Sequence, residues 1–277
     1  MINEQAKANG GINLKNWQTQ RAQIIVTYDC NRDCPFCINY RLGQKRKGFV
    51  KVSDALYFLQ YVKYVENIKE AIVVFLGGEP TLLPLETLKE LSDLVHSMGY
   101  KTEFYTNGVI KEKLLELDGY IDFITISNYS KGLLPFENAD WLYKFEKSTI
   151  TISKLISKQS FKTFEDFDKF VDEANKLPFN YDFATMQEMT PDFDLYHPEW
   201  VEEKLLPRCE SQSVGGNVGA VLYKDRLIKL PHKKFHIKED ICQFKLYPNG
   251  NVNTSWKNDD MEIDYKKAVN DLLRKNV

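Results

Sequence analysis

The chain has 277 residues, of which 43% are hydrophobic and 13% aromatic, so it can fold as one large domain or as a domain with an appendage. Its formal net charge of -2 argues against a general nucleic-acid binder, and no apolar run approaches the roughly 20 residues that span a bilayer. Five cysteines, three of them clustered, and a polar start without a signal-peptide core favour a reducing cytoplasm over a secreted disulfide framework.

The predicted elements alternate between strands and helices from position 22 onward. The apolar run 71–76 predicts a buried strand, and the helical spacing of 85–98 stops at Gly99, which is typical of a helix end. Thr163 and Asp166 stand at the capping-box distance and predict the start of a helix. The expected strands are 22–26, 71–76, 102–106, 121–127, 149–156 and 181–188, and the expected helices are 53–67, 85–98, 111–117, 138–147 and 163–177.

Six strands with helices between them build a parallel sheet through right-handed crossovers. Six units are fewer than the eight of a closed TIM barrel. The sequence therefore predicts an α/β fold, a partial (βα)6 TIM-type barrel over 20–190, preceded by an N-terminal extension of residues 1–19. Catalytic groups are expected at the carboxyl ends of its strands.

The alternation stops at Pro191. Residues 191–277 are expected to form a small α+β C-terminal appendage that helps to shape a substrate pocket. Within it, 221–230 and 244–254 are expected to be short antiparallel strands, with the turn residues Pro-Asn-Gly-Asn at 248–251.

Three cysteines follow the first expected strand in the run CNRDCPFC, at Cys30, Cys34 and Cys37. A closed structural metal site has four ligands, whereas three ligands leave one coordination position open for chemistry. The residues alone leave open a zinc knuckle with a distant fourth ligand or a chance cluster.

A second motif, Gly77-Gly78-Glu79-Pro80, directly follows the expected strand 71–76. Glycines at a strand end permit backbone conformations that other residues resist, and they let a ligand approach closely. Glu79 can accept a hydrogen bond from an ammonium group. Taken alone, the segment is equally well an ordinary turn between a strand and a helix.

With the two motifs one strand–helix unit apart, the chain resembles the radical S-adenosylmethionine (SAM) superfamily. The resemblance implies that Cys30, Cys34 and Cys37 bind three irons of a [4Fe-4S] cluster and that the fourth iron chelates SAM. It implies reductive cleavage of SAM to methionine and a 5′-deoxyadenosyl radical, which abstracts a hydrogen from the substrate. It also implies a place beside SAM for Phe36, the aromatic residue before the last cysteine, and for residues 77–80.

Further segments match the family less specifically. Thr106, in the run Tyr-Thr-Asn-Gly, and Ser127, at the end of the fourth expected strand, are candidate SAM contacts, or else a turn residue and a strand-end cap. Gln187 and Glu188 near the end of the sixth expected strand are candidate catalytic residues, or else a solvent-facing pair.

The appendage resembles a degenerate auxiliary-cluster domain of the SPASM or twitch type. Its Cys242 precedes two expected strands with a Pro-Asn-Gly turn, but Ser255-Trp256 stands where a closing cysteine is expected. The residues that could bind a second metal are Cys209, His232, His236 and Cys242. Buried structural cysteines are the alternative reading.

The resemblance implies an oxidoreductase that modifies a peptide or specialised metabolite, supplied with electrons by a flavodoxin- or ferredoxin-type donor. The basic residues Arg41, Lys45, Arg46 and Lys47 could dock such an acidic donor, or they are a solvated loop. A glycyl-radical-enzyme activating enzyme is the enzymatic alternative. A non-catalytic metal-binding protein on the same barrel is the alternative from another class.

Overall fold

The computed structural model of this chain describes residues 20–37, 48–185, 196–212, 219–230, 244–253 and 263–275. All strands in these ranges join one 11-stranded sheet in the order β11-β10-β1-β2-β3-β4-β5-β6-β9-β8-β7. The six central strands are β1 (Gln20–Thr27), β2 (Ala71–Gly77), β3 (Lys101–Thr106), β4 (Phe123–Asn128), β5 (Thr149–Ile156) and β6 (Asn180–Thr185). These six run parallel to one another, as the alternation in the sequence predicts.

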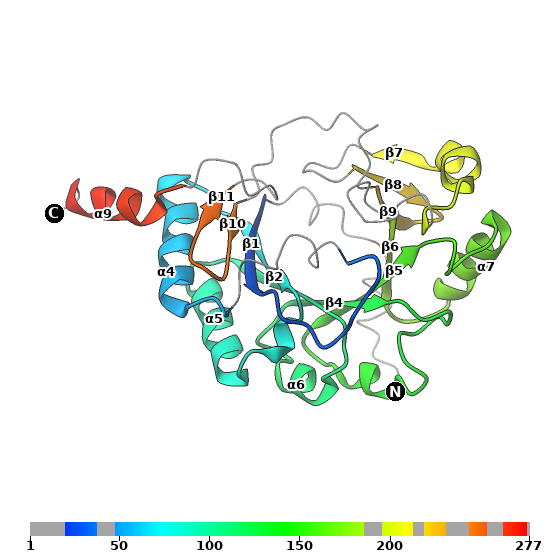
Figure 1. The fold of residues 1–277 in the computed structure, drawn as a ribbon, viewed down its shortest axis with the longest axis horizontal. Helices are drawn as coiled ribbons and strands as arrows, with labels where there is room; N and C mark the ends of the chain where they lie inside the picture. Colours follow the sequence, from blue (N-terminus) through cyan, green and yellow to red (C-terminus); the bar gives the residue numbers. More distant parts are fainter. Residues whose placement is uncertain are drawn as a thin grey trace.

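Helices cover the convex side of the sheet (Figure 1). They are α4 (Val52–Gln60), α5 (Leu85–Ser97), α6 (Lys111–Glu116) and α7 (Phe164–Ala174), and a further helix, α9 (Tyr265–Lys275), lies near the end of the chain. Strand alternation directs every second side chain toward these helices. On β6, for example, Tyr181 and Phe183 pack their rings against Phe167 and Phe170 of α7. Among the described residues, none of the helices has both the length and the apolar composition that a membrane crossing requires.

The sheet is curled but not closed, as the predicted partial barrel requires. On β9 (Arg226–Leu230), the Lys229 Nζ donates a hydrogen bond of 3.3 Å to the hydroxyl of Tyr105 on β3, although β4, β5 and β6 lie between the two strands. Only a strongly curved sheet brings these side chains together. The outermost strands β11 and β7 remain unpaired with each other, so the barrel is open.

Segments from the expected appendage extend both edges of this sheet. A hairpin of β10 (Lys245–Leu246) and β11 (Val252–Asn253) adds to β1, and its turn includes Gly250 at a φ of +83°, as the sequence predicts. At the opposite edge, β9 pairs with β6 in parallel, followed by β8 (Gly219–Tyr223) and β7 (Glu210–Gln212). The boundary at residue 190 between barrel and appendage stays a prediction.

Three sequence expectations are wrong in detail. The segment 221–230 is not one strand, because Lys224 and Asp225, both with positive φ, form a tight turn between β8 and β9. The expected helix 138–147 is only a 3-10 turn, Asp140–Lys144, whose N-terminus has no side-chain cap. The expected helix 53–67 leaves α-helical geometry at Gln60, continues as a π-helical turn over Tyr61–Val65, and stops before Asn67, which has a φ of +56°.

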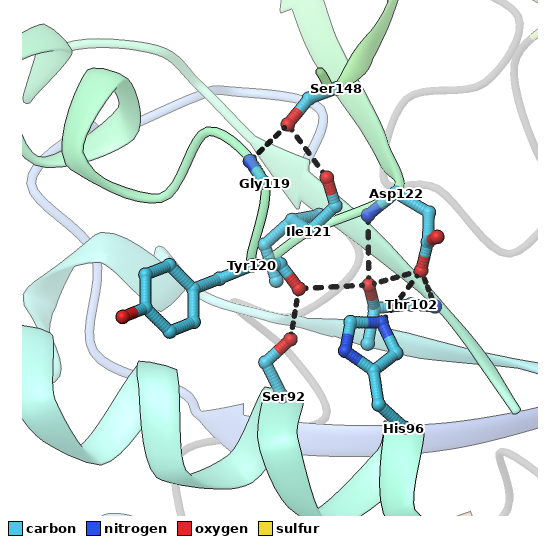
Figure 2. A network of polar contacts seen from close by, with 8 residues as sticks. All are labelled: Ser92, His96, Thr102, Gly119, Tyr120, Ile121, Asp122 and Ser148. Atoms are coloured by element: carbon cyan, nitrogen blue, oxygen red, sulfur yellow. Dashed lines mark hydrogen bonds and ion pairs between the residues drawn. The ribbon is translucent and has the colours of Figure 1, made fainter. Parts of the chain in front are cut away.

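A polar network fixes the amino-terminal edge of the sheet, opposite the carboxyl ends of the strands (Figure 2). The Asp122 Oδ2 accepts hydrogen bonds from the Thr102 amide at 2.8 Å and the Thr102 hydroxyl at 2.9 Å, and it lies 2.9 Å from His96 Nε2. Ser92 donates to the carbonyl of Tyr120, and Ser148 donates to that of Ile121 at 2.6 Å. The network joins α5 to the starts of β3, β4 and β5.

Replacing Asp122 with asparagine tests this network. Burial alone would raise the pKa of Asp122, but the hydrogen bonds from Thr102 and His96 lower it below its usual value. A carboxylate with a depressed native pKa stabilises the fold above its unfolded-state pKa, and this stabilisation is lost as the pH falls through the native pKa. We expect Asp122→Asn to lower the free energy of unfolding by about 1–2 kcal/mol at pH 7 in urea titrations, and by less near pH 3.

The control is Glu86→Gln, which removes an exposed i,i+3 pair with Lys89 and should leave the urea midpoint unchanged. An Asp122→Asn effect that is equal at pH 7 and pH 3 would contradict the assigned role of the carboxylate charge.

Candidate active site

The three clustered cysteines lie on the loop that follows β1, at the carboxyl end of the sheet. Cys30 is exposed, and Cys34 and Cys37 are partly buried. The loop is folded on itself, because the Cys37 amide donates to the Cys34 carbonyl at 3.0 Å and the Arg32 amide donates to the Cys30 Sγ at 3.4 Å. Burial raises the pKa values of the Cys30 and Cys34 thiols, and the charge of Cys37 raises both further. Three thiolates in this loop therefore need a cationic partner.

The arrangement of the thiols distinguishes between kinds of metal site. In the part of the chain that the structure describes, no three His, Cys, Asp or Glu side chains converge as a single metal ion requires. The thiols are still close enough to shift one another's pKa. An iron–sulfur cube places each thiolate on a different iron, so it needs neighbouring rather than convergent sulfurs. A set of three neighbouring thiols fits such a cube, which takes one thiolate on each of three irons.

The turn after β2 is held directly against the cysteine loop. The Gly78 amide donates to the Thr27 carbonyl at 2.7 Å, and the Glu79 amide donates to the Asp29 carbonyl at 2.8 Å. A Cβ atom on Gly77 would stand 2.1 Å from the Thr27 carbonyl oxygen, and one on Gly78 would stand 2.0 Å from that of Asp29. Gly77 also has a φ of +133°. The two glycines therefore permit close contact between the cysteine loop and the turn after β2. From the sequence alone, glycines at these positions could equally serve the close approach of a ligand.

The Glu79 carboxylate is fully buried and joins the ends of β2 and β3. Its Oε1 accepts hydrogen bonds from the Thr81 amide at 3.0 Å, the Thr81 hydroxyl at 2.6 Å and the Thr106 hydroxyl at 2.7 Å. Its Oε2 accepts one from the Asn107 amide at 2.7 Å. Three of these four bonds fall on Oε1 and one on Oε2, so Oε2 retains capacity for a further hydrogen bond. Glu79 thus has a structural role that the sequence did not indicate, and a SAM contact by its side chain stays a prediction.

The loop after β3 completes the junction. Asn107 Nδ2 donates to Asn31 Oδ1 at 2.7 Å and lies 3.8 Å from the Cys30 Sγ. Thr106, a candidate SAM contact, is buried with its hydroxyl on Glu79. Sequence reasoning missed Asn31 and Asn107, although an asparagine inside the cysteine run and another directly after a strand are both well suited to bridging loops.

The end of β4 also reaches the cysteine loop. The Ser127 side chain hydrogen-bonds the side chain of Tyr129. The Phe36 ring lies 5.1 Å from the ring of Tyr129 and 6.2 Å from that of Tyr196. The structure therefore brings Phe36 and Ser127 to the same end of the sheet as the cysteines and Gly77-Gly78-Glu79-Pro80.

Below these loops, the inner face of the sheet carries ionic groups, which we call the ion cluster: Arg21, Glu103, Tyr105, Thr125, Asp182 and Lys229. Arg21 pairs with Glu103 at 2.6 Å, and Lys229 pairs with Asp182 at 2.6 Å. Burial raises the pKa of Tyr105, whose hydroxyl lies between the two pairs. A closed barrel fills its interior with branched apolar side chains, so buried ions here indicate a site for a polar molecule.

Several predicted site residues lie outside the described ranges, namely Gln187, Glu188, His232, His236, Cys242 and the basic residues 41–47. Cys209 is described, and its Sγ donates to the Leu205 carbonyl at 3.3 Å. Burial raises the pKa of Cys209 to about 12, which suits a packed thiol.

Comparison with known proteins gives matches of three kinds, to a family model, to curated relatives and to solved structures. Residues 24–127 match the model of the Radical SAM superfamily. An S-adenosylmethionine-dependent nucleotide dehydratase of Flammeovirga pacifica is 33% identical over 103 residues, which are 35% of this chain and 34% of that protein. A putative glycyl-radical enzyme activating enzyme of Methanocaldococcus jannaschii is 26% identical over 113 residues, 40% of this chain and 44% of that protein. The chain thus spans less than half the length of both curated relatives.

The structure of native anSMEcpe with bound AdoMet superposes with a TM-score of 0.56 at 16% identity, over 90% of this chain and 80% of that one. This likeness supports the mixed α/β fold with a mostly parallel, open sheet. The segment 24–127, which includes the cysteine loop and the turns after β2 and β3, is the part of the chain that matches the radical SAM superfamily.

Proposed function

We propose that this chain is an enzyme that cleaves SAM reductively and uses the radical to abstract a hydrogen from its substrate. Cys30, Cys34 and Cys37 would hold a [4Fe-4S] cluster, which when bound supplies the electron that splits SAM into methionine and a 5′-deoxyadenosyl radical. The observation that carries the proposal is the direct bonding of the cysteine loop to the turns after β2 and β3.

The chain's own residues would place SAM and protect the reaction. Gly77 and Gly78 hold the turn after β2 against the cysteine loop, and Glu79 fixes that turn to Thr106 and Asn107. Backbone groups of these turns and the Glu79 Oε2, which accepts one hydrogen bond from the Asn107 amide, are the groups that would bind the amino acid part of SAM. The curled sheet beneath them encloses the reacting groups, and such enclosure keeps water and competing donors away from a reactive intermediate.

The substrate class and the electron donor are proposed from likeness to known families and from the charge of one segment. The resemblance of the C-terminal segment to a SPASM or twitch domain favours a peptide or a specialised metabolite. The relative from Flammeovirga pacifica makes a nucleotide a second candidate, and the relative from Methanocaldococcus jannaschii keeps a glycyl-radical enzyme as the third. A flavodoxin- or ferredoxin-type donor would dock through the basic residues between 41 and 47.

Anaerobic reconstitution with iron and sulfide separates this enzyme from a non-catalytic metal-binding protein. We expect about four irons per chain and formation of 5′-deoxyadenosine from SAM after reduction with dithionite. Bound zinc without SAM cleavage would support the non-catalytic alternative.

Replacing single cysteines tests the ligand assignment. We expect Cys34→Ala to lose the brown chromophore and to reduce 5′-deoxyadenosine formation at least 100-fold, because two thiolates cannot retain the cube. The matched control is Cys209→Ala, since that thiol donates to the Leu205 carbonyl away from the loop. SAM cleavage retained by Cys34→Ala would refute its role, and loss of metal in Cys209→Ala would indicate a second metal site.

A methyl group added at Gly78 tests the junction of the two loops. Because its Cβ would stand 2.0 Å from the Asp29 carbonyl oxygen, Gly78→Ala must separate the turn from the cysteine loop. We expect this variant to bind SAM at least tenfold more weakly in equilibrium dialysis and to lose cluster iron faster in the presence of a chelator.

Gly132→Ala is the control for this prediction, because the added Cβ would meet its nearest neighbour, the Leu134 carbonyl oxygen, at an ordinary distance of 3.6 Å. Equal SAM affinity in Gly78→Ala and Gly132→Ala would show that the contact is not needed for binding.

A further inference from the structure

Asp182 lies on the inner face of the curled sheet. Its strand neighbours Tyr181 and Phe183 pack against α7, so alternation directs the Asp182 side chain toward the interior. Asp182 is 6% exposed and is therefore buried. A carboxylate in such a place is rare unless all of its hydrogen-bonding capacity is used or kept for a ligand.

The two oxygens of Asp182 differ in their partners. The Oδ2 pairs with Lys229 Nζ at 2.6 Å, whereas the buried Oδ1 has no hydrogen-bond partner among the described residues. Both carboxylate oxygens of Glu103 in the neighbouring ion pair have partners, because Oε2 binds Arg21 at 2.6 Å and Oε1 accepts from the Thr125 hydroxyl at 3.3 Å. Within the described ranges, the carboxylates of the ion cluster therefore include one oxygen without a partner.

The position of Asp182 relates this acceptor to the candidate SAM site. Ser127 on β4 is in register with Ser153 on β5, which is in register with Asp182 on β6. Adjacent strands are about 4.8 Å apart, so Asp182 lies about 10 Å across the inner face from Ser127.

The inner residues Tyr105, Ser127, Ser153 and Ala184 are partly exposed, whereas Thr125 and Asp182 are buried. Phe123 and Thr151, inner residues nearer the amino ends of their strands, are partly exposed as well. Asp182 is thus a buried position with partly exposed residues beside it on the inner face.

The charges in the ion cluster select the kind of group that could reach this oxygen. The Asp182 carboxylate only accepts hydrogen bonds, so an acceptor or an anion gains nothing there. The charge of Asp182 is already balanced by Lys229. An additional cation would be repelled by the Lys229 ammonium at a buried position, where water screens the charges poorly. A neutral donor, a hydroxyl or an amide N–H, meets neither obstacle.

We propose that Asp182 is a substrate-recognition residue whose Oδ1 accepts a hydrogen bond from a neutral hydroxyl or amide N–H of the substrate. The inference deepens the proposed function and rests on it for the word substrate, but the acceptor site itself does not depend on SAM cleavage. Sugars, nucleosides and peptides all carry such donors.

The proposal is tested by soaking three small molecules of similar shape into crystals of the full chain, reconstituted with its cluster and SAM. Acetamide carries neutral N–H donors, N,N-dimethylacetamide has the same carbonyl without a donor, and methylammonium is a charged donor. We expect acetamide alone to bind, with its nitrogen about 2.7–3.2 Å from Asp182 Oδ1.

Asp182→Asn should abolish this preference. The asparagine oxygen should accept from Lys229 and its NH2 group should face the interior, so acetamide and N,N-dimethylacetamide should both bind through their carbonyl oxygens. Glu103→Gln, which alters the satisfied ion pair, should retain the wild-type choice of acetamide.

The proposal would be overturned if Oδ1 were bonded by another part of the chain, or by a water that none of the three probes displaces. Preferential binding of methylammonium, or failure of acetamide to bind, would also overturn it. Formation of 5′-deoxyadenosine by the same wild-type preparation is measured separately. Its absence would overturn the radical SAM function and leave the result with the probes intact.

Discussion

The buried carboxylate of Glu79 is the interaction on which the site depends. Four hydrogen bonds join it to Thr81, Thr106 and Asn107, while its own amide is bonded to the Asp29 carbonyl in the cysteine loop. A charge with no exposure to water is stable only when it is hydrogen-bonded, so these segments hold one another in a fixed arrangement. The same contacts explain why the preceding residues are glycines, because any Cβ would push the two loops apart.

The two faces of the sheet carry different kinds of side chain, apolar on the outer face and ionic on the inner face. The outer face carries aromatic and aliphatic side chains that pack under the helices, as on β6 and α7, and the network around Asp122 fixes the amino-terminal edge. The inner face instead carries the ion cluster. A polar interior costs stability, and a protein keeps one where function requires it.

Sequence reasoning predicted the parallel sheet and the adjacency of the two main motifs, because hydrophobic periodicity and strand–helix alternation are local signals and parallel strands place their carboxyl ends together. It could not predict the ion cluster, since Arg21, Glu103 and Asp182 are far apart in sequence and single charges in strands also occur on solvent-facing positions. The turn at Lys224 and Asp225 was missed because lysine is not a typical choice for positive φ and no glycine marks the turn. The bond from Asn107 to Asn31 depends on the curl of the sheet.

The central claim is that the three thiols hold an iron–sulfur cube to which SAM binds directly. Electron paramagnetic resonance of the dithionite-reduced, reconstituted protein tests this claim, because a ligand on the cluster changes the g values of the signal. The account predicts a reduced-cluster signal whose g values shift when SAM is added. A signal that SAM leaves unchanged, or the absence of a cluster signal in protein that has bound zinc, would contradict it.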